Sequence, residues 1–256
     1  MRTINNIARR VRLVLGGIAM FKSWGLWLGY RFGFSFVRKK GMGLFHIRGG
    51  PAFKINYAQT DVGTLQEVWL MDLYQKHYRA KPGDVVIDIG ANFGAFAVLA
   101  AKSGATVYAY EPTPRQFDLL SENTRGLPVH CYKLAVAGKS GEINIYEAPG
   151  GDAGNSVIYN EHLKRIPFVA KAITLREIIN ETGRCDFLKI DCEGSEVDIL
   201  RTAPREIFAR IDNIALEYHD NLEEMKQIFR TLDYKFVTPG KGKYGYLYAW
   251  RGGRPN

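Results

Sequence analysis

Residues 85–94 read Val-Val-Ile-Asp-Ile-Gly-Ala-Asn-Phe-Gly. The β-branched run at the start of this stretch predicts a buried strand, and the two glycines that follow predict a tight turn into a helix. Gly90 and Gly94 let the backbone pass close to a ligand, while the first amides of the helix point toward it. The dinucleotide fingerprint G-x-G-x-x-G is absent. The spacing is D-x-G-x-N-x-G, which suits a ligand with a sulfonium and an amino-acid tail better than a pyrophosphate.

Short β-branched runs alternate with helical stretches from Lys81 to the C-terminus, which is typical of a parallel sheet with helices on both faces. Further strands are predicted at 106–110, 129–134, 187–191, 213–217, 235–237 and 246–250, and helices at 94–103, 115–125, 175–180, 196–201 and 222–232. The last two strands are joined by a Gly- and Lys-rich link without a helix, so we expect them to form a hairpin. An added stretch at 142–147 and a loop at 148–166 interrupt the alternation, and a loop of this length is usually functional.

Acidic side chains follow two of these strands. Glu111 stands in Tyr110-Glu111-Pro112, about 20 residues beyond the glycine turn, where a carboxylate can accept both hydroxyls of a ribose. NAD enzymes use the same arrangement, so Glu111 alone indicates an adenosine site, with a solvated loop carboxylate as the alternative. Asp191 and Glu193 follow another strand, at the edge of a parallel sheet where ligands bind.

The segment after Glu193 also has a purely structural interpretation, because Ser195 followed by Asp198 fits a helix-capping signal. A later strand ends in Glu217-Tyr218-His219 on the same edge of the sheet. His219 is our candidate general base, and a satisfied or surface histidine is the alternative.

Residues 1–60 carry eleven Lys or Arg and no Asp or Glu, whereas the rest of the chain holds 24 basic and 26 acidic side chains. We therefore expect a basic N-terminal extension at 1–60 and an enzyme-like domain at 61–256. A nucleic-acid enzyme would more often carry its basic stripe beside the active site. The three cysteines, Cys131, Cys185 and Cys192, lie too far apart for a zinc or redox motif, and their odd number favours a reducing, cytosolic location.

Within the extension, three arginines precede an apolar run at 13–21, and an aromatic-rich stretch follows at 24–30. Neither piece reaches the roughly 20 apolar residues that span a bilayer. A signal peptide is one interpretation, but no A-x-A cleavage site follows. The other two are an amphipathic segment within residues 1–45 on an anionic membrane, with Trp24 and Trp27 at the interface, and a helical cap over the substrate pocket.

Taken together, residues 88–96, Tyr110-Glu111-Pro112, residues 189–196 and Glu217-Tyr218-His219 resemble the FkbM family of methyltransferases over about residues 61–250. The resemblance implies a class I α/β fold, a Rossmann-like doubly wound sheet that is mostly parallel with an antiparallel last strand; a helical extension precedes it here. It also implies S-adenosylmethionine as methyl donor and O-methylation of a sugar, polyketide or similar natural product. By this likeness the methionine part would be contacted by Asp88, Gly90, Asn92 and Gly94. The ribose would be contacted by Glu111, and the adenine edge by Ala135 and Val136.

An alcohol is a poor nucleophile, so we expect His219 or Asp191 to take the hydroxyl proton and Glu193 to orient the acceptor. A second hypothesis places Mg²⁺ between Asp191 and Glu193, since hard cations prefer oxygen ligands.

The rival functions are an NAD-dependent oxidoreductase, a binding protein that kept the fold without catalysis, and a methyltransferase acting on RNA or protein. Asn92 in the turn and the lack of a catalytic Tyr-Lys pair speak against the oxidoreductase. The family likeness favours a glycan or lipid-linked acceptor over RNA, and Trp24, Trp27 and Tyr30 could stack on sugar or lie at a membrane.

Overall fold

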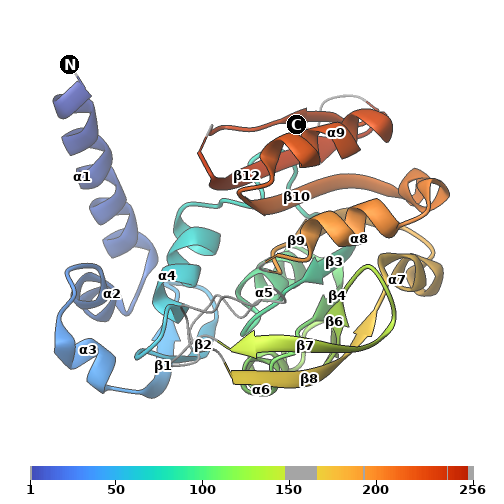
Figure 1. The fold of residues 1–256 in the computed structure, drawn as a ribbon. Helices are drawn as coiled ribbons and strands as arrows, with labels where there is room; N and C mark the ends of the chain where they lie inside the picture. Colours follow the sequence, from blue (N-terminus) through green and yellow to red (C-terminus); the bar gives the residue numbers. More distant parts are fainter. Residues whose placement is uncertain (1, 148–165, 193, 241, 253–256) are drawn as a thin grey trace. The chain divides into compact units, whose positions relative to one another are not determined.

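The computed structural model describes residues 2–147, 166–192, 194–240 and 242–252, and the chain divides into two compact units, Met1–Asp72 and Leu73–Asn256. The sequence led us to place this boundary after residue 60. The elements of the first unit are α1 (Arg2–Met20), α2 (Trp24–Arg31), α3 (Ser35–Lys39), β1 (Met42–His46), β2 (Ala52–Asn56), α4 (Asp61–Leu65) and a π-helical turn, η1 (Gln66–Leu70) (Figure 1).

The first unit has an aromatic core of its own. The fully buried ring of Phe21 packs 5.6 Å from Trp27 and 5.1 Å from Phe45, centroid to centroid. Trp27 also donates a hydrogen bond from its indole nitrogen to Gln66 at 3.1 Å. The expectation that Trp27 lies at a membrane interface was therefore wrong, because its ring and its N–H are both used inside the unit.

The predicted helical extension is present in α1, α2 and α3. The antiparallel hairpin β1–β2, which pairs Met42 with Asn56 and His46 with Ala52, was not predicted. Within the described part of the chain, no helix combines the length and the apolar character that a membrane crossing requires.

The second unit is built on a seven-stranded sheet in the order β11-β12-β10-β9-β3-β4-β5. In this sheet β12 pairs antiparallel with both β10 and β11, and β11 and β12 form the predicted hairpin. The sheet consists of β3 (Val85–Ile89), β4 (Thr106–Tyr110), β5 (Val129–Tyr132), β9 (Cys185–Ile190), β10 (Ile211–His219), β11 (Lys235–Val237) and β12 (Tyr244–Trp250). The predicted class I sheet is thus confirmed.

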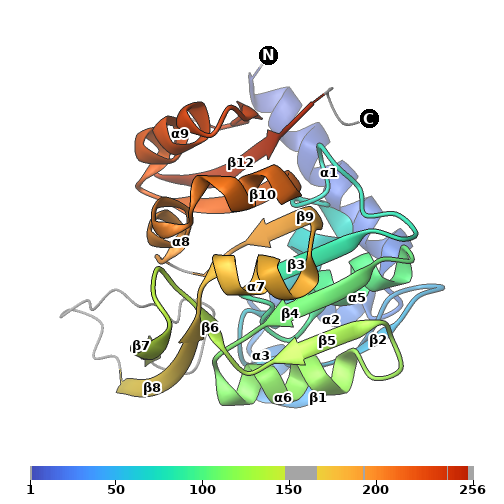
Figure 2. The same ribbon diagram turned by 90° about the vertical axis from the view of Figure 1, so that its right-hand side faces the viewer.

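Helices cover both faces of this sheet (Figure 2). One face is covered by α7 (Leu175–Thr182), α8 (Glu196–Thr202), the 3-10 helix η3 (Arg205–Arg210) and α9 (Leu222–Thr231). Their apolar side chains share one core with Ile87, Ile89, Leu188 and Ile190. Side chains alternate along a strand, so Phe187 points to the opposite face, where its ring meets Phe96 of α5 (Ala95–Lys102). Next to α5 along the chain, α6 (Pro114–Asn123) follows β4.

A small second sheet, in the order β6-β8-β7, was only partly predicted. The added stretch at 142–147 is strand β7 (Gly141–Glu147), and it pairs antiparallel with β8 (Ile166–Ile173), which the sequence analysis missed. The third strand, β6 (Ala135–Val136), lies just beyond the predicted end of β5. Residues 148–165 of the predicted functional loop lie outside the described residues.

Gly90 brings the ends of two strands together. It has a φ of +74°, and a Cβ placed there would overlap the backbone carbonyl oxygen of Asp191. The amide of Asp191 in turn donates to the carbonyl of Ile89 at 3.1 Å. The turn after β3 and the end of β9 therefore touch backbone to backbone, which only a glycine permits.

We predict that Gly90→Ala and Gly126→Ala differ sharply in their effect on the free energy of unfolding. Gly126 has a similar φ of +79° but nothing within 4 Å of an added Cβ, so its substitution carries only the left-handed strain of about 1–2 kcal/mol. Gly90→Ala adds the backbone overlap and should lose at least about 4 kcal/mol or fail to fold. Urea denaturation of both variants measures this, and equal losses would contradict the close approach.

Candidate functional site

A buried ion pair lies at the carboxyl edge of the sheet. Asp88 and Lys189 are register partners on the parallel strands β3 and β9, and their side chains meet at 3.1 Å between Oδ1 and Nζ. Both residues are almost completely shielded from solvent. The Lys189 ammonium also donates to the carbonyl of Gly90 at 2.7 Å, which holds the glycine turn against the end of β9.

Asp191 extends this cluster toward the open edge. Its Oδ2 accepts a 2.6 Å hydrogen bond from the Tyr74 hydroxyl and lies 3.8 Å from the Lys189 ammonium. The ammonium lies 5.2 Å from the centroid of the Tyr74 ring, which adds a cation–π contact. The Tyr246 ring packs edge-on against Tyr74 at 5.5 Å. Asp191 is thus a half-buried carboxylate held by a hydroxyl and a cation.

The charge states of this cluster follow from burial and pairing. Burial lowers the pKa of Lys189, but the attraction of Asp88 and Asp191 outweighs it and keeps that pKa above its ordinary value. Burial raises the pKa of Asp88, and the Lys189 ammonium offsets part of the rise. Burial and the neighbouring Asp191 raise the pKa of Tyr74, so its hydroxyl stays a donor. Lys189 is therefore a permanent cation that stabilises two carboxylates.

A second cluster joins the glycine turn to the end of β4. The buried Glu111 carboxylate accepts the Asn92 amide at 2.9 Å on one oxygen and the Thr113 amide at 2.8 Å on the other. Asn92 has a φ of +52°, and its side-chain oxygen accepts the amide of Phe93 at 2.8 Å, which stabilises this conformation. Burial raises the pKa of Glu111, and the two amides offset part of the rise. The structure thus brings together two residues that were predicted separately.

The two glycines of the turn have different neighbours. Gly94, with a φ of +91°, precedes α5, and an added Cβ would lie 2.9 Å from Leu120 of α6. Gly90 faces the backbone of Asp191, as described above. The structure therefore gives each glycine a packing role inside the protein, and their predicted closeness to a ligand stays a prediction.

His219 lies at the end of β10 beside a buried acid. Its Nδ1 is 3.4 Å from Oε1 of Glu196, a side chain with no exposed area, and its ring meets Tyr244 edge-on at 5.8 Å. Burial raises the pKa of Glu196, but the hydrogen bonds from His219 and the Gly194 amide outweigh it, and the net direction is down. Glu196 is therefore an ionised partner of His219.

The capping signal at Ser195 is not used as predicted. The Ser195 side chain makes no capping hydrogen bond and donates to the sulfur of Cys192 instead. The Glu196 carboxylate accepts the Gly194 amide at 3.0 Å on one of its oxygens. Glu193 lies outside the described residues, so its predicted role in orienting the acceptor stays a prediction.

Ala135 and Val136 form β6 and are buried. They pair in parallel with Ala172 and Ile173 of β8, in the small sheet rather than in the seven-stranded one. Val136 shares the core that contains Tyr110, the residue before Glu111. An apolar pair on this side of Glu111 is compatible with the predicted adenine edge.

The Mg²⁺ hypothesis gains no support from the contacts of Asp191, because this carboxylate already faces the Lys189 ammonium. Across the described ranges, which omit Glu193, no group of three or more His, Cys, Asp and Glu side chains is placed to hold a metal ion.

Three residues of this edge were not predicted from the sequence: Tyr74, Lys189 and Glu196. The ion pair could have been predicted from the sequence, because Asp88 and Lys189 each stand between two apolar residues, one position before the end of a buried strand. Glu196 stood in the motif but was overlooked. Tyr74 reaches Asp191 across 117 residues of sequence, and no local pattern indicates that contact.

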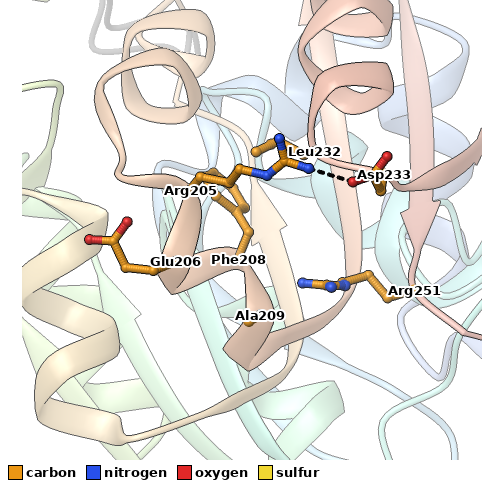
Figure 3. Close-up of a pocket in the computed structure, with 7 residues that line it drawn as sticks. All are labelled: Arg205, Glu206, Phe208, Ala209, Leu232, Asp233 and Arg251. Atoms are coloured by element: carbon orange, nitrogen blue, oxygen red, sulfur yellow. Dashed lines mark hydrogen bonds and ion pairs between the residues drawn. The ribbon is translucent and has the colours of Figure 1, made fainter.

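A separate pocket of about 420 Å³ lies at the opposite ends of the strands (Figure 3). Its residues come from η3, the end of α9 and the residue after β12. Figure 3 shows Arg205 paired with Asp233 above Phe208, while Glu206 points away. None of the predicted site residues lines it. Ligands of open α/β sheets bind at the carboxyl ends of the strands, so we place the functional site at the other edge.

Comparisons with known proteins match this sequence to a methyltransferase family. The family model described as the methyltransferase FkbM domain matches residues 88–248. The chain is similar to hexuronic acid methyltransferase AglP of Haloferax volcanii, with 28% identity over 56% of this chain and 63% of that protein. It is also similar to 31-O-demethyl-FK506 methyltransferase FkbM of Streptomyces tacrolimicus, with 27% identity over 60% of this chain and 73% of that protein. The chain thus spans a little under two thirds of AglP.

Among solved structures, the chain is similar to TYW2 of P. horikoshii in complex with MeSAdo. The TM-score is 0.44 and the identity 13%, with 81% of this chain and 69% of that chain covered.

We predict that Lys189→Met destabilises the protein in a pH-dependent way. Without the ammonium the pKa of the buried Asp88 rises further above its unfolded value, so stability falls as the pH rises from about 4. The free energy of unfolding near pH 7, measured by chemical denaturation, should fall by about 3–5 kcal/mol, because a buried charge has lost its partner. A flat pH profile for this variant would contradict the assigned pairing.

Two further variants test the same pair. Asp88→Asn combined with Lys189→Met removes the titrating group and should abolish the added pH dependence. Lys226→Met is the matched control, because it breaks an ion pair with the exposed Glu223 and should change stability little.

Proposed function

The chain belongs to the FkbM family of methyltransferases, and from this premise we propose that it transfers a methyl group from S-adenosylmethionine to a hydroxyl of a glycan, lipid-linked sugar or related natural product. The observation that carries the proposal is the hydrogen bond from the Asn92 amide to the Glu111 carboxylate. It holds a carboxylate and a glycine turn side by side at the carboxyl edge of the sheet, where nucleosides bind in this class of fold.

The Glu111 carboxylate keeps hydrogen-bonding capacity for a ribose hydroxyl. Its oxygens accept the backbone amides of Asn92 at 2.9 Å and of Thr113 at 2.8 Å, and the Thr113 side chain donates a further hydrogen bond. A carboxylate has about four acceptor sites, so about one is left for a ribose hydroxyl. The protein has already fixed the position of this group.

The charge at this edge favours a cationic cofactor over a pyrophosphate. Asp88, Asp191 and Glu111 lie around the single ammonium of Lys189, which is itself bonded to Asp88 and Gly90. Carboxylates therefore outnumber the cation among these described groups, and such a field attracts positive charge. When bound, S-adenosylmethionine supplies a methyl group activated by a positive sulfonium.

We assign the proton transfer to His219. Its Nδ1 lies 3.4 Å from the ionised Glu196, and we propose that the other ring nitrogen, Nε2, takes the proton of an acceptor hydroxyl. Glu196 is then a positioning residue. Asp191 is the poorer candidate, because its Oδ2 already accepts the Tyr74 hydroxyl and lies 3.8 Å from the Lys189 ammonium.

The names of the relatives guide the choice of acceptor. AglP is named for hexuronic acid and FkbM for 31-O-demethyl-FK506. Both names favour a small molecule or a glycan over RNA or protein, which remain the runner-up acceptors. We place the enzyme on the cytosolic side of the cell.

We predict that Glu111→Gln weakens binding of S-adenosylhomocysteine at least about tenfold in calorimetry, because one acceptor oxygen becomes a donor. The exposed Glu142→Gln is the matched control and should bind like the original chain. NAD should produce no thermal shift. Equal affinity of the two variants would refute the ribose assignment, and a shift with NAD alone would favour the oxidoreductase.

We predict that labelled S-adenosylmethionine transfers label to the lipid or polysaccharide fraction of a cell extract rather than to RNA or protein. His219→Ala should lower the rate about 10²–10⁴-fold with unchanged S-adenosylhomocysteine binding, because only proton transfer is lost. His130→Ala, at an exposed histidine that stacks on Tyr108, is the control. Full activity of His219→Ala would exclude the base, loss of activity in EDTA would restore the metal hypothesis, and label in no fraction would favour a binding protein.

A further inference from the structure

The exposed apolar side chains of this protein are concentrated in its first unit. Within the described ranges, eight of the ten large hydrophobic residues that are exposed belong to residues 1–72: Val11, Leu15, Trp24, Phe32, Phe34, Phe36, Met42 and Leu44. Single exposed apolar residues are normal on a protein surface, whereas a contiguous group marks an interaction site.

Three of these residues form one contiguous group, which we call the phenylalanine tip: Phe32, Phe34 and Phe36. Their exposed fractions are 64%, 54% and 60%. The ring of Phe34 lies 6.4 Å from that of Phe32 and stacks on that of Phe36 at 6.0 Å. Phe32 and Phe34 lie in the turn between α2 and α3, and Phe36 lies at the start of α3.

The backbone holds the tip in a fixed turn. Gly33 has a φ of +73° and donates to the carbonyl of Tyr30 at 3.0 Å, and Phe34 donates to the carbonyl of Gly29 at 2.8 Å. These two bonds are the standard C-terminal cap of a helix that ends at a glycine. Val37, one residue beyond the tip, is fully buried and anchors α3. The three rings are thus presented by an ordered turn, and little conformational entropy is lost when they bind.

Positively charged residues flank the tip in the sequence. Arg31 precedes it, and the exposed Arg38, Lys39 and Lys40 follow Val37. The nearest acid in the sequence is Asp61, which is buried. A cluster of exposed aromatic rings next to cations matches the interface of an anionic bilayer, where rings enter the headgroup region and cations face lipid phosphates.

We propose that the phenylalanine tip docks the protein on the surface of an anionic phospholipid membrane, with Arg38, Lys39 and Lys40 at the headgroups. The contact is peripheral. Trp27 takes no part, since it is buried in the core of the unit, and the tip replaces it as the aromatic anchor. This docking does not depend on the methyltransferase assignment.

The test is flotation of the full chain with vesicles of phosphatidylcholine alone or containing about one third phosphatidylglycerol. The original chain should float with the anionic vesicles and much less with the neutral ones. Replacing all three phenylalanines of the tip by serine should weaken the partition coefficient at least about tenfold. The substituted side chains are exposed, so the thermal unfolding midpoint should be retained.

Two matched controls separate the contributions. Val169→Ser removes a residue with 61% exposure in the second unit and should float like the original chain. Neutralising Arg38, Lys39 and Lys40 to glutamine should weaken flotation, whereas neutralising the exposed Lys102, Arg125 and Lys139 should have a smaller effect.

Three outcomes would overturn the proposal. The original chain fails to float with anionic vesicles; the triple serine variant floats as well as the original; or RNA displaces the chain from vesicles and binds the serine variant equally well. The last outcome would assign the basic surface to nucleic acid. Binding of S-adenosylhomocysteine by the serine variant should be unchanged, so failure of docking and failure of the enzymatic proposal are distinguishable.

Discussion

The Lys189 ammonium fixes the geometry of the sheet edge, because it is bonded at once to the Asp88 carboxylate and to the carbonyl of Gly90. An apolar pair at positions 88 and 189 would fill a buried sheet at lower desolvation cost, so the charges are better explained by the geometry they enforce than by stability. With Gly90 held, the turn can place the Asn92 amide on Glu111. The glycine turn, β9 and the end of β4 are thereby joined through one cation.

The acids of this edge have two different environments, which suits two different tasks. Glu111 is buried with backbone amides as partners and its pKa is raised, whereas Glu196 is buried beside an imidazole and its pKa is lowered. The first arrangement retains acceptor capacity for neutral hydroxyl groups. The second stabilises positive charge on His219 during a proton transfer. The two carboxylates are thus both glutamates, and their pKa values shift in opposite directions because their partners differ.

Most of the sheet, but only part of the site, could be predicted from the sequence. Strands such as β3 and β4 were predictable because buried parallel strands are continuous β-branched runs. Asn92 and Glu111 were predicted separately at the carboxyl edge of the parallel strands, and the hydrogen bond that joins them was not predicted. Tyr74 was not predictable, since its bond to Asp191 arises only when the chain between them has folded. Strand β8 was missed because its partner β7 lies beyond residues 148–165, and pairing across such a gap leaves no local signal.

Aromatic residues of the first unit illustrate the same limit. Composition shows that aromatic rings and cations share this region, but it cannot say which rings face solvent. Trp27 has a polar N–H that requires a partner when buried, and Gln66 supplies it. The phenylalanines of the tip have no polar atom, so nothing except packing or an external apolar phase can shield them. Packing is excluded for Phe32, Phe34 and Phe36 by their exposure, whereas Phe21 and Phe45 are fully buried. One residue type therefore serves as core and as surface within one unit, and the capped turn at Gly33 holds Phe32 and Phe34 on the surface.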